Sequence, residues 1–286
     1  MKKNINDIAL PIGTILNNRY VIEQIYYWGY LNILYRCRDM TIEDEVMVKE
    51  FCPYALCYRD IDGKNITCKG NMFMNDYRSA YQSFEYECNV VKILYAKDIK
   101  NIVKYRDDFT ENETKYYVTD MIDGFPLDDI VEKKISFNKV KIMRSLIRTI
   151  RSIHLGGILH LDIKPSNIII NSKEEAVLID FGNACNMNEK QKENIFVSKG
   201  FSAPEIYYKG NIGIETDIYS LGALLYYILS STVPPAADKR MEGEKILELS
   251  RMTTIAYPLE DCIMRALQLE SGKRFKNLSL FEKIIR

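Results

Sequence analysis

The sequence lacks the features that would assign it to several specialised classes of protein. Its 39 Lys and Arg side chains equal its 39 Asp and Glu side chains in number, so no overall basic charge favours nucleic acid. No run of 18 apolar residues could span a membrane, and residues 1–13 carry no apolar stretch of signal-peptide length. We therefore expect a cytoplasmic protein that neither binds nucleic acid nor spans a membrane.

Cysteine is present but follows no disulfide pattern. The seven cysteines are odd in number and scattered, and 286 residues suffice to bury a core without covalent staples. Reduced thiols, as in a cytosol, are expected. Cys52, Cys57 and Cys68 lie closer together, but their spacing fits no common zinc motif and no histidine is near them. The sequence thus favours free thiols over a metal site there.

The first part of the chain has the pattern of a β-sheet. Residues 19–39 carry β-branched and aromatic runs on both sides of Gly29, which predicts a hairpin. Residues 45–51 and 116–122 are short apolar runs and are predicted to be further strands. Residues 52–78 look irregular and polar, with a turn at Asp62-Gly63. The long stretch between Lys49 and Glu87 either forms an extra hairpin that regulates the following helix or is inert.

The remaining pattern is mainly helical. Apolar residues recur at helical spacing in 78–95 and in 137–154. Residues 217–230 are apolar on nearly all sides, as in a buried helix. Strands followed by helices predict an α+β protein, and the composition changes near residues 121–124.

Residues 160–170, HLDIKPSNIII, are the most informative segment. Asp162, Lys164 and Asn167 lie in a predicted loop between a helix and an apolar strand, and Asp180 follows thirteen residues after Asn167. Carboxylate and amide oxygens are the ligands that Mg²⁺ prefers, usually together with substrate phosphates. A further carboxylate could accept a hydroxyl proton, so the segment predicts phosphate chemistry.

The order and spacing of three motifs resemble those of the protein kinases. His-x-Asp-x-Lys-x-x-Asn stands at 160–167, Asp-Phe-Gly at 180–182 and Ala-Pro-Glu at 203–205. The segments 49–60 and 233–240 are similar to stretches of the bacterial eukaryotic-like, or Hanks-type, serine/threonine kinases.

The resemblance implies a two-lobed kinase fold. Residues 1–121 would form a small β-rich lobe with one helix and an insertion at about 52–78, and residues 122–286 a mainly helical lobe. The resemblance also implies ATP and Mg²⁺ as cofactors, and a protein with a Ser or Thr acceptor as substrate.

The resemblance implies roles for four residues in phosphoryl transfer and Mg²⁺ binding. Asp162 would orient the substrate hydroxyl or accept its proton, and Lys164 would neutralise the γ-phosphate. A Lys at that position resembles the kinases that are specific for Ser and Thr rather than Tyr. Asn167 and Asp180 would hold Mg²⁺.

Other positions would bind the nucleotide. Lys49 would contact the α- and β-phosphates, and Glu87 would orient that lysine. Gly29 would lie in the phosphate-binding loop. The adenine would lie against a hinge from Asp120 to Ile122, with Thr119 as the gatekeeper.

Four further positions would support the fold of the site. Glu205 would pair with Arg274 and brace the peptide-docking surface, and Asp217 would tie down the catalytic loop. His160 would support that loop without transferring a proton.

The phosphate-binding loop departs from the glycine-rich pattern. The usual Gly-x-Gly-x-x-Gly falls on residues 27–32, where only Gly29 remains. Asn32 tolerates positive φ better than most residues, whereas Tyr27 does not and should hold the loop off or stiffen it. Trp28 is either an exposed docking aromatic or a lid over the nucleotide. Met47 replaces the Ala that usually lies above adenine, which could lower nucleotide affinity.

A second departure concerns activation. Leu161 replaces the Arg that pairs with a phosphorylated activation loop in many relatives. The segment between Phe181 and Ala203 has Ser198 and Ser202 but no Thr. The sequence therefore predicts activity that does not depend on activation-loop phosphorylation, with Ser198 placing the substrate hydroxyl.

The leading hypothesis is an active serine/threonine protein kinase. The alternative is a pseudokinase that binds nucleotide or other proteins, because the glycine loop is degenerate. A small-molecule phosphotransferase is weaker, since such enzymes typically lack Ala-Pro-Glu and its partner Arg. The chain is either a stand-alone kinase or a fragment, and a homodimer stays open.

Overall fold

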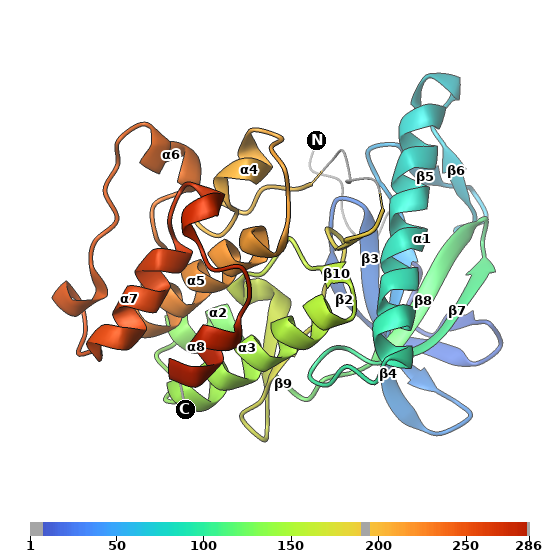
Figure 1. Cartoon of the computed structure of the whole chain (residues 1–286). Coiled ribbons are helices and arrows are strands. Elements are labelled where there is room, and N and C mark those ends of the chain that lie inside the picture. Colours follow the sequence, from blue (N-terminus) through green and yellow to red (C-terminus); the bar gives the residue numbers. More distant parts are fainter. Residues whose placement is uncertain (1–7, 190–194, 285–286) are drawn as a thin grey trace. The chain divides into compact units, whose positions relative to one another are not determined.

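The computed structural model describes residues 8–189 and 195–284, and the chain divides into two compact units. The first unit runs up to Tyr95 and resumes over Val103–Met121. The second unit takes Ala96–Ile102 and continues from Ile122. The first unit contains a β-sheet with one long helix, and the second is mainly helical, which confirms the predicted α+β class (Figure 1).

The first unit is built on one antiparallel sheet of six strands in the order β1-β2-β3-β4-β8-β7. The hairpin predicted around Gly29 is formed by β2 and β3, with Trp28 opposite Ile33. The strands are β1 (Ile15–Leu16), β2 (Tyr20–Trp28), β3 (Asn32–Asp39), β4 (Asp44–Phe51), β7 (Tyr105–Glu111) and β8 (Thr114–Asp120).

The segment between β4 and the long helix α1 (Met74–Ala96) is more regular than its sequence suggests. Strands β5 (Cys57–Arg59) and β6 (Ile66–Cys68) form a second small hairpin there, so the stretch is not irregular throughout, and the extra hairpin left open for this segment is present. The predicted turn is present, since the N–H of Gly63 donates to the carbonyl of Asp60 at 2.9 Å. Each strand has only three residues, too few to produce a clear alternation in the sequence.

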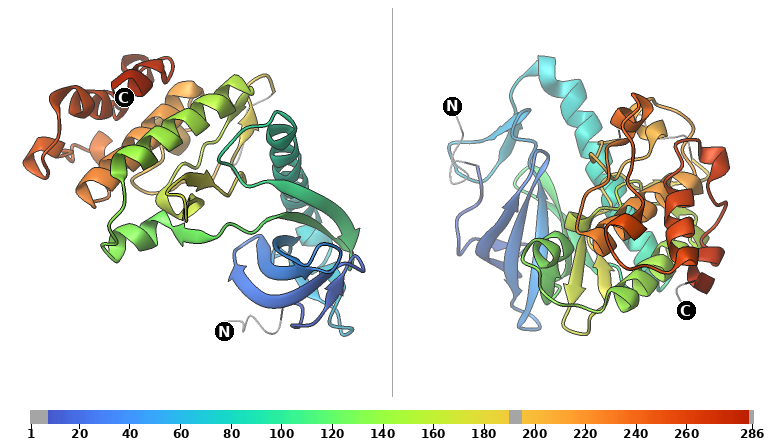
Figure 2. Two further views of the ribbon diagram at one scale, coloured as in Figure 1. Left: turned by 90° about the horizontal axis from the view of Figure 1, so that it is seen from below. Right: turned by 90° about the vertical axis from the view of Figure 1, so that its left-hand side faces the viewer.

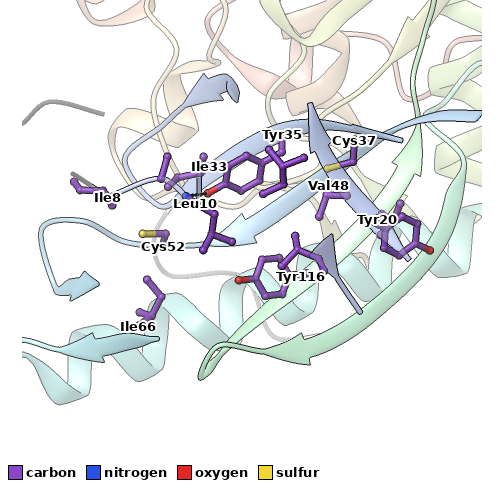
Figure 3. Close-up of a cluster of buried hydrophobic side chains, with 14 of the residues drawn as sticks. Ile8, Leu10, Tyr20, Ile33, Tyr35, Cys37, Val48, Cys52, Ile66 and Tyr116 are labelled. Carbon is purple, nitrogen blue, oxygen red and sulfur yellow. Dashed lines mark hydrogen bonds between the residues drawn. The ribbon is translucent and has the colours of Figure 1, made fainter. Parts of the chain in front are cut away.

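The core of the first unit lies between the main sheet, the small hairpin and the residues before β1 (Figure 3). Alternate side chains of the central strands point into it, as the two-residue period of a strand requires. Its labelled members include Leu10, Tyr20, Ile33, Tyr35, Val48, Cys52, Ile66 and Tyr116.

In the second unit, α3 (Lys139–Leu155) and α5 (Ile214–Ser230) pack against each other (Figure 2). Helix α5 buries thirteen consecutive residues, from Thr216 to Ile228, which confirms the buried helix expected at 217–230. Strands β9 (Gly124–Pro126), β11 (Ile168–Asn171) and β12 (Ala176–Leu178) form a small antiparallel sheet in the order β12-β11-β9. No helix among the described residues is long and apolar enough to cross a membrane.

The remaining elements of the second unit are short. They are α2 (Leu127–Glu132), β10 (Ile158–Leu159), β13 (Cys185–Asn186), α4 (Pro204–Tyr207), α6 (Ala237–Met241), α7 (Tyr257–Ala266) and α8 (Ser279–Ile284).

A buried carboxylate connects the small hairpin to the main sheet. Glu50 of β4 is fully buried and accepts hydrogen bonds from the hydroxyls of Tyr35 at 2.7 Å and Tyr116 at 2.6 Å. The guanidinium of Arg59 in β5 lies 2.8 Å from the same carboxylate, and its side chain is 3% exposed. Arg59 also donates to the backbone carbonyls of Ile8 and Lys64. A buried charge needs such partners, so this network fixes where the hairpin lies on the sheet.

We predict that Arg59→Ala destabilises the protein by about 3 kcal/mol, because it leaves the Glu50 carboxylate buried without its cation. The measurement is the free energy of unfolding in urea. The matched control is Arg38→Ala, which removes a half-exposed ion pair with Glu23 and should cost less than about 1 kcal/mol. Equal losses in the two variants would contradict this view of Glu50.

Candidate functional site

Two of the predicted nucleotide-binding residues meet inside the first unit. The ammonium of Lys49 on β4 lies 2.6 Å from Oε1 of Glu87 on α1, and both side chains are nearly buried. The hydroxyl of Tyr117 donates to the same Oε1 at 2.7 Å. Lys49 lies opposite Tyr117 in the pairing of β4 with β8, and its ammonium lies 5.7 Å from the centroid of the Tyr117 ring. The lysine is therefore held in one orientation by charge, hydrogen bonding and an aromatic ring.

The residues predicted to line the adenine site stand at the end of β8. Thr119 is buried and lies opposite Met47 of β4. The carboxylate of Asp120 pairs with Arg106 on the neighbouring strand. Ile122, two residues on, is the residue at which the second unit resumes.

The degenerate phosphate loop is a tight hairpin end. The N–H of Gly29 donates to the carbonyl of Asn32 at 2.9 Å, which leaves Tyr30 and Leu31 at the tip. Neither Gly29 nor Asn32 has positive φ, so the left-handed tolerance expected of Asn32 is not used. The ring of Tyr27 folds back over Gly29, since a Cβ added there would lie 3.0 Å from the ring.

Trp28 packs against the first unit and is not an exposed docking aromatic, while its role as a lid over the nucleotide stays a prediction. Its ring packs edge-on against Tyr54 at 5.4 Å between centroids, and Tyr30 contacts Tyr54 in the same way at 5.7 Å. Trp28 adjoins the core of the first unit, and its indole nitrogen is buried. The aromatic side chains thus supply a support for the loop where glycines would supply freedom.

In the second unit, Asp162 is the centre of a hydrogen-bonded group. Its Oδ2 accepts from the ammonium of Lys164 at 2.8 Å and from the Asn167 amide at 2.9 Å. Its Oδ1 accepts from the hydroxyl of Ser198 at 2.6 Å. The ammonium of Lys164 also lies 3.2 Å from that hydroxyl, so three predicted residues converge on one carboxylate.

The residues predicted to hold magnesium lie next to each other. The backbone N–H of Ile179 donates to the backbone carbonyl of Asn167 at 3.1 Å, which brings Asp180 beside Asn167. Because the Asn167 amide nitrogen donates to Asp162, its oxygen is the atom left as a ligand. One amide oxygen and one carboxylate are hard donors that suit Mg²⁺, which takes few protein ligands and completes its shell with water and phosphates. Among the described residues, no group of three or more His, Cys, Asp and Glu side chains could hold a metal.

The loop that carries Asp162 is fixed by a buried carboxylate. Asp217, near the start of α5, accepts from the backbone N–H groups of His160 and Leu161, both at 2.8 Å. The ring of His154 lies 2.8 Å from the same carboxylate. Burial alone would raise the pKa of Asp217, but these hydrogen bonds and the His154 ring lower it below its ordinary value. Asp217 is therefore a permanent anion beneath the loop.

His160 is enclosed under this loop. Its side chain is fully buried, its ring lies 5.0 Å from that of Phe181, and its Nδ1 faces the N–H of Asp162 at 3.3 Å. Burial lowers its pKa, so the ring is neutral. Its Nε2 has no hydrogen-bond partner among the described residues.

Leu161 is buried in a wholly apolar cluster. It packs with Leu159, Cys185 and Ile206, and further apolar side chains surround these four: Met187, Ile195, Ile212 and Ile214. Its φ of 62° is left-handed, a conformation that a leucine adopts only when its surroundings impose it. Leu161, which replaces the Arg that would bind a phosphorylated activation loop, thus contacts the segment after Asp-Phe-Gly through apolar packing instead.

The predicted pair of Glu205 and Arg274 is formed in bidentate geometry. The two guanidinium nitrogens donate to the two carboxylate oxygens at 2.7 and 3.0 Å, and Arg274 is 1% exposed. Thr216 donates to the same carboxylate at 2.8 Å. Arg274 therefore joins α4 to the start of α5.

Sequence reasoning missed two supporting residues in and just before the small hairpin. Tyr54 and Arg59 both lie in the stretch taken as irregular. Both residues lie in segment 49–60, whose resemblance to bacterial Hanks-type kinases was a signal, but neither has a periodic partner that would indicate its contacts.

Comparison with known proteins agrees with this architecture. Residues 55–280 match the protein kinase domain family. A serine/threonine-protein kinase D of Synechocystis is 30% identical over 204 residues, which cover 68% of this chain and 40% of that protein. A probable serine/threonine-protein kinase of Clostridium perfringens is 24% identical, over 93% of this chain and 37% of that protein. The chain spans less than half the length of these curated relatives.

Solved structures show the same fold. The apo form of PpkA-294 is 26% identical and superposes with a TM-score of 0.83, covering 97% of this chain and 99% of the other. The kinase domain of Mycobacterium tuberculosis PknI, at 15% identity, has a TM-score of 0.67 and shares the fold. The chain belongs to the protein kinase family, in its bacterial Hanks-type serine/threonine branch.

Proposed function

We propose that this chain is an active serine/threonine protein kinase that transfers the γ-phosphoryl group of ATP to a protein hydroxyl. The observation that carries the proposal is the group around Asp162, in which a carboxylate, an ammonium, an amide and a hydroxyl share hydrogen bonds of 2.6–3.2 Å. The buried pair of Lys49 and Glu87 adds the second requirement, a lysine oriented for phosphate.

The proposed chemistry assigns one task to each group. Asp162 would orient the acceptor hydroxyl and take its proton, while Lys164 would balance charge on the phosphoryl group in transfer. Lys49 would bind the α- and β-phosphates. Asn167 and Asp180 would hold Mg²⁺, which supplies charge neutralisation to the phosphates when bound.

Independence from activation-loop phosphorylation is part of the proposal. Ser198 and Ser202 are the only hydroxyl side chains between Phe181 and Ala203. Ser198 is bonded to Asp162, and Ser202 is buried and accepts from the N–H of Ser198 at 2.8 Å. Both hydroxyls are thus engaged, and Leu161 offers a phosphate no charge.

A pseudokinase is the second candidate, and the phosphate loop favours it. Its tip lacks positive φ and is packed on Tyr54, so it has less freedom to fit phosphates than a glycine-rich loop. Such a protein would bind nucleotide or a protein partner without turnover. The presence of all six ionic and amide groups argues for the enzyme, because folding alone does not need them. They are Lys49, Glu87, Asp162, Lys164, Asn167 and Asp180.

We predict that Asp162→Asn lowers turnover by at least about 10²-fold, because general-base help is lost while the shape is kept. The assay is transfer of label from ATP–Mg²⁺ to a generic basic protein, with circular dichroism to check folding. Asp180→Ala should abolish the signal, and the exposed Asp98→Asn should keep it. Equal labelling by the unaltered chain and Asp180→Ala would establish the pseudokinase instead.

We predict that Ser198→Ala lowers the transfer rate to a defined peptide about tenfold, the effect of a hydrogen bond to a charged group. Ser198→Thr keeps the hydroxyl and should retain most of the rate. Single-turnover measurements report the chemical step directly. An unchanged rate in Ser198→Ala would rule out a substrate-placing role for this hydroxyl.

We predict that treatment with a broad-specificity phosphatase leaves the transfer rate unchanged, because apolar packing at Leu161 holds the activation segment. Leu161→Ala should lower the free energy of unfolding by about 2–4 kcal/mol and reduce the rate as well. The matched control is Leu155→Ala, whose side chain is largely exposed. A phosphatase-sensitive rate would refute phosphorylation independence.

A further inference from the structure

Two cysteines of the small hairpin face each other across its strands. Cys57 of β5 and Cys68 of β6 are direct partners in the antiparallel register. The N–H of Lys69 donates to the carbonyl of Leu56, and the N–H of Asp60 donates to that of Asn65. Because hydrogen-bonded pairs alternate along an antiparallel ladder, the intervening Cys57–Cys68 pair is a non-hydrogen-bonded one.

This pairing suits a covalent bond between the sulfurs. In a non-hydrogen-bonded pair the Cα atoms lie about 4.5 Å apart and the two side chains leave the same face. That separation falls within the range of about 4.4–6.8 Å that disulfides occupy. Cys37 and Cys185, by contrast, lie opposite Val46 and Leu159 in their ladders.

The two thiols differ in access, although both donate to a backbone carbonyl, that of Cys68 to Gly70 at 3.6 Å. Cys68 is partly exposed, whereas Cys57 is 1% exposed and its thiol donates to the carbonyl of Pro53 at 3.2 Å. The neighbouring thiol of the fully buried Cys52 lowers the pKa of Cys57 against the opposing effect of burial. The nearby charge of Lys69 acts in the same direction.

The same residues hold the phosphate loop. Tyr54, between Cys52 and Cys57 in the sequence, is the aromatic side chain on which Trp28 packs. The ammonium of Lys69, next to Cys68, donates to the carbonyls of Tyr54 at 2.7 Å and Ala55 at 2.9 Å. The N–H of Cys52 donates to the carbonyl of Leu31 at the loop tip.

We propose that Cys57 and Cys68 are a redox modification site, which peroxide oxidises to a reversible disulfide, and that the phosphate loop responds through Tyr54. The consequence follows from the bonds already described. Once Cys57 is oxidised it has no S–H to donate, so the turn at Pro53 that carries Tyr54 loses a constraint. The support beneath Trp28 then loosens.

The chemistry balances with hydrogen peroxide as the oxidant. The accessible Cys68 thiolate attacks one peroxide oxygen, the O–O bond breaks, and the departing hydroxide takes a proton to become water. The product is a sulfenic acid on Cys68. The Cys57 sulfur attacks the Cys68 sulfur, the S–O bond breaks, and the second water leaves with the Cys57 proton. Two thiols lose two electrons and two protons, and one peroxide becomes two waters.

The sequence provides its own probe for this event, because Trp28 is the only tryptophan. The full chain, without nucleotide, is treated with hydrogen peroxide, alkylated under denaturing conditions and digested for peptide mapping. We expect a linked peptide pair containing Cys57 and Cys68, lighter by two hydrogen masses than the reduced pair. We also expect the emission of Trp28 to shift to longer wavelength, and dithiothreitol to reverse both changes.

Variants separate the site from general oxidation. Cys68→Ser changes a partly exposed side chain and should abolish both the linkage and the shift. Cys262→Ser, on α7 of the second unit, is the matched control and should keep both. A bond from Cys57 to Cys52, no bond at all, or a bond without a change at Trp28 would each overturn the proposal. The readouts use no ATP, so they stand apart from the test of kinase activity.

Discussion

The second unit depends on one buried carboxylate, that of Asp217. An anion without water is stable only if donors surround it, and here the donors are two consecutive backbone N–H groups and the His154 ring. Satisfying it forces Leu161 into left-handed backbone at φ 62°. That conformation directs the next residue, Asp162, toward Lys164 and Ser198. The geometry of the hydrogen-bonded group around Asp162 is thus a consequence of how the buried charge of Asp217 is satisfied.

The backbone strain at Leu161 has a compensating source. A left-handed leucine costs on the order of 1 kcal/mol, while burying its side chain returns roughly 2 kcal/mol. The cluster that receives it draws on the residues after Asp-Phe-Gly, such as Cys185 and Met187, and on Ile206 of α4. An arginine could not enter this cluster without burying a charge. Apolar packing and ionic anchoring are therefore exclusive solutions at this position, and the chain has adopted the first.

The sequence was sufficient to predict features that depend on invariant spacing. The hairpin around Gly29 and the buried helix α5 required only residue order and periodicity, whereas the pairing of Glu205 with Arg274 was implied by the resemblance to the protein kinases. The hairpin of β5 and β6 stayed one of two alternatives in the sequence, because three-residue strands leave no measurable alternation that would place it. The packing of Trp28 was equally hidden, since its partner Tyr54 lies in the turn just before that hairpin.

The phosphate loop shows how a degenerate motif can be rebuilt by other means. Glycine gives such a loop freedom to approach phosphates, and the cost is disorder when no ligand is bound. Here the loop is a closed hairpin end supported by Trp28, Tyr30 and Tyr54, so much of its ordering is complete before a ligand arrives. A preordered loop loses less entropy on binding but cannot adapt its shape. On the proposed function, its fit to phosphate would be set by the segment beneath it, which Glu50 and Arg59 fix to the sheet. The small hairpin, which carries none of the kinase motifs, is in this way part of the machinery that positions the loop.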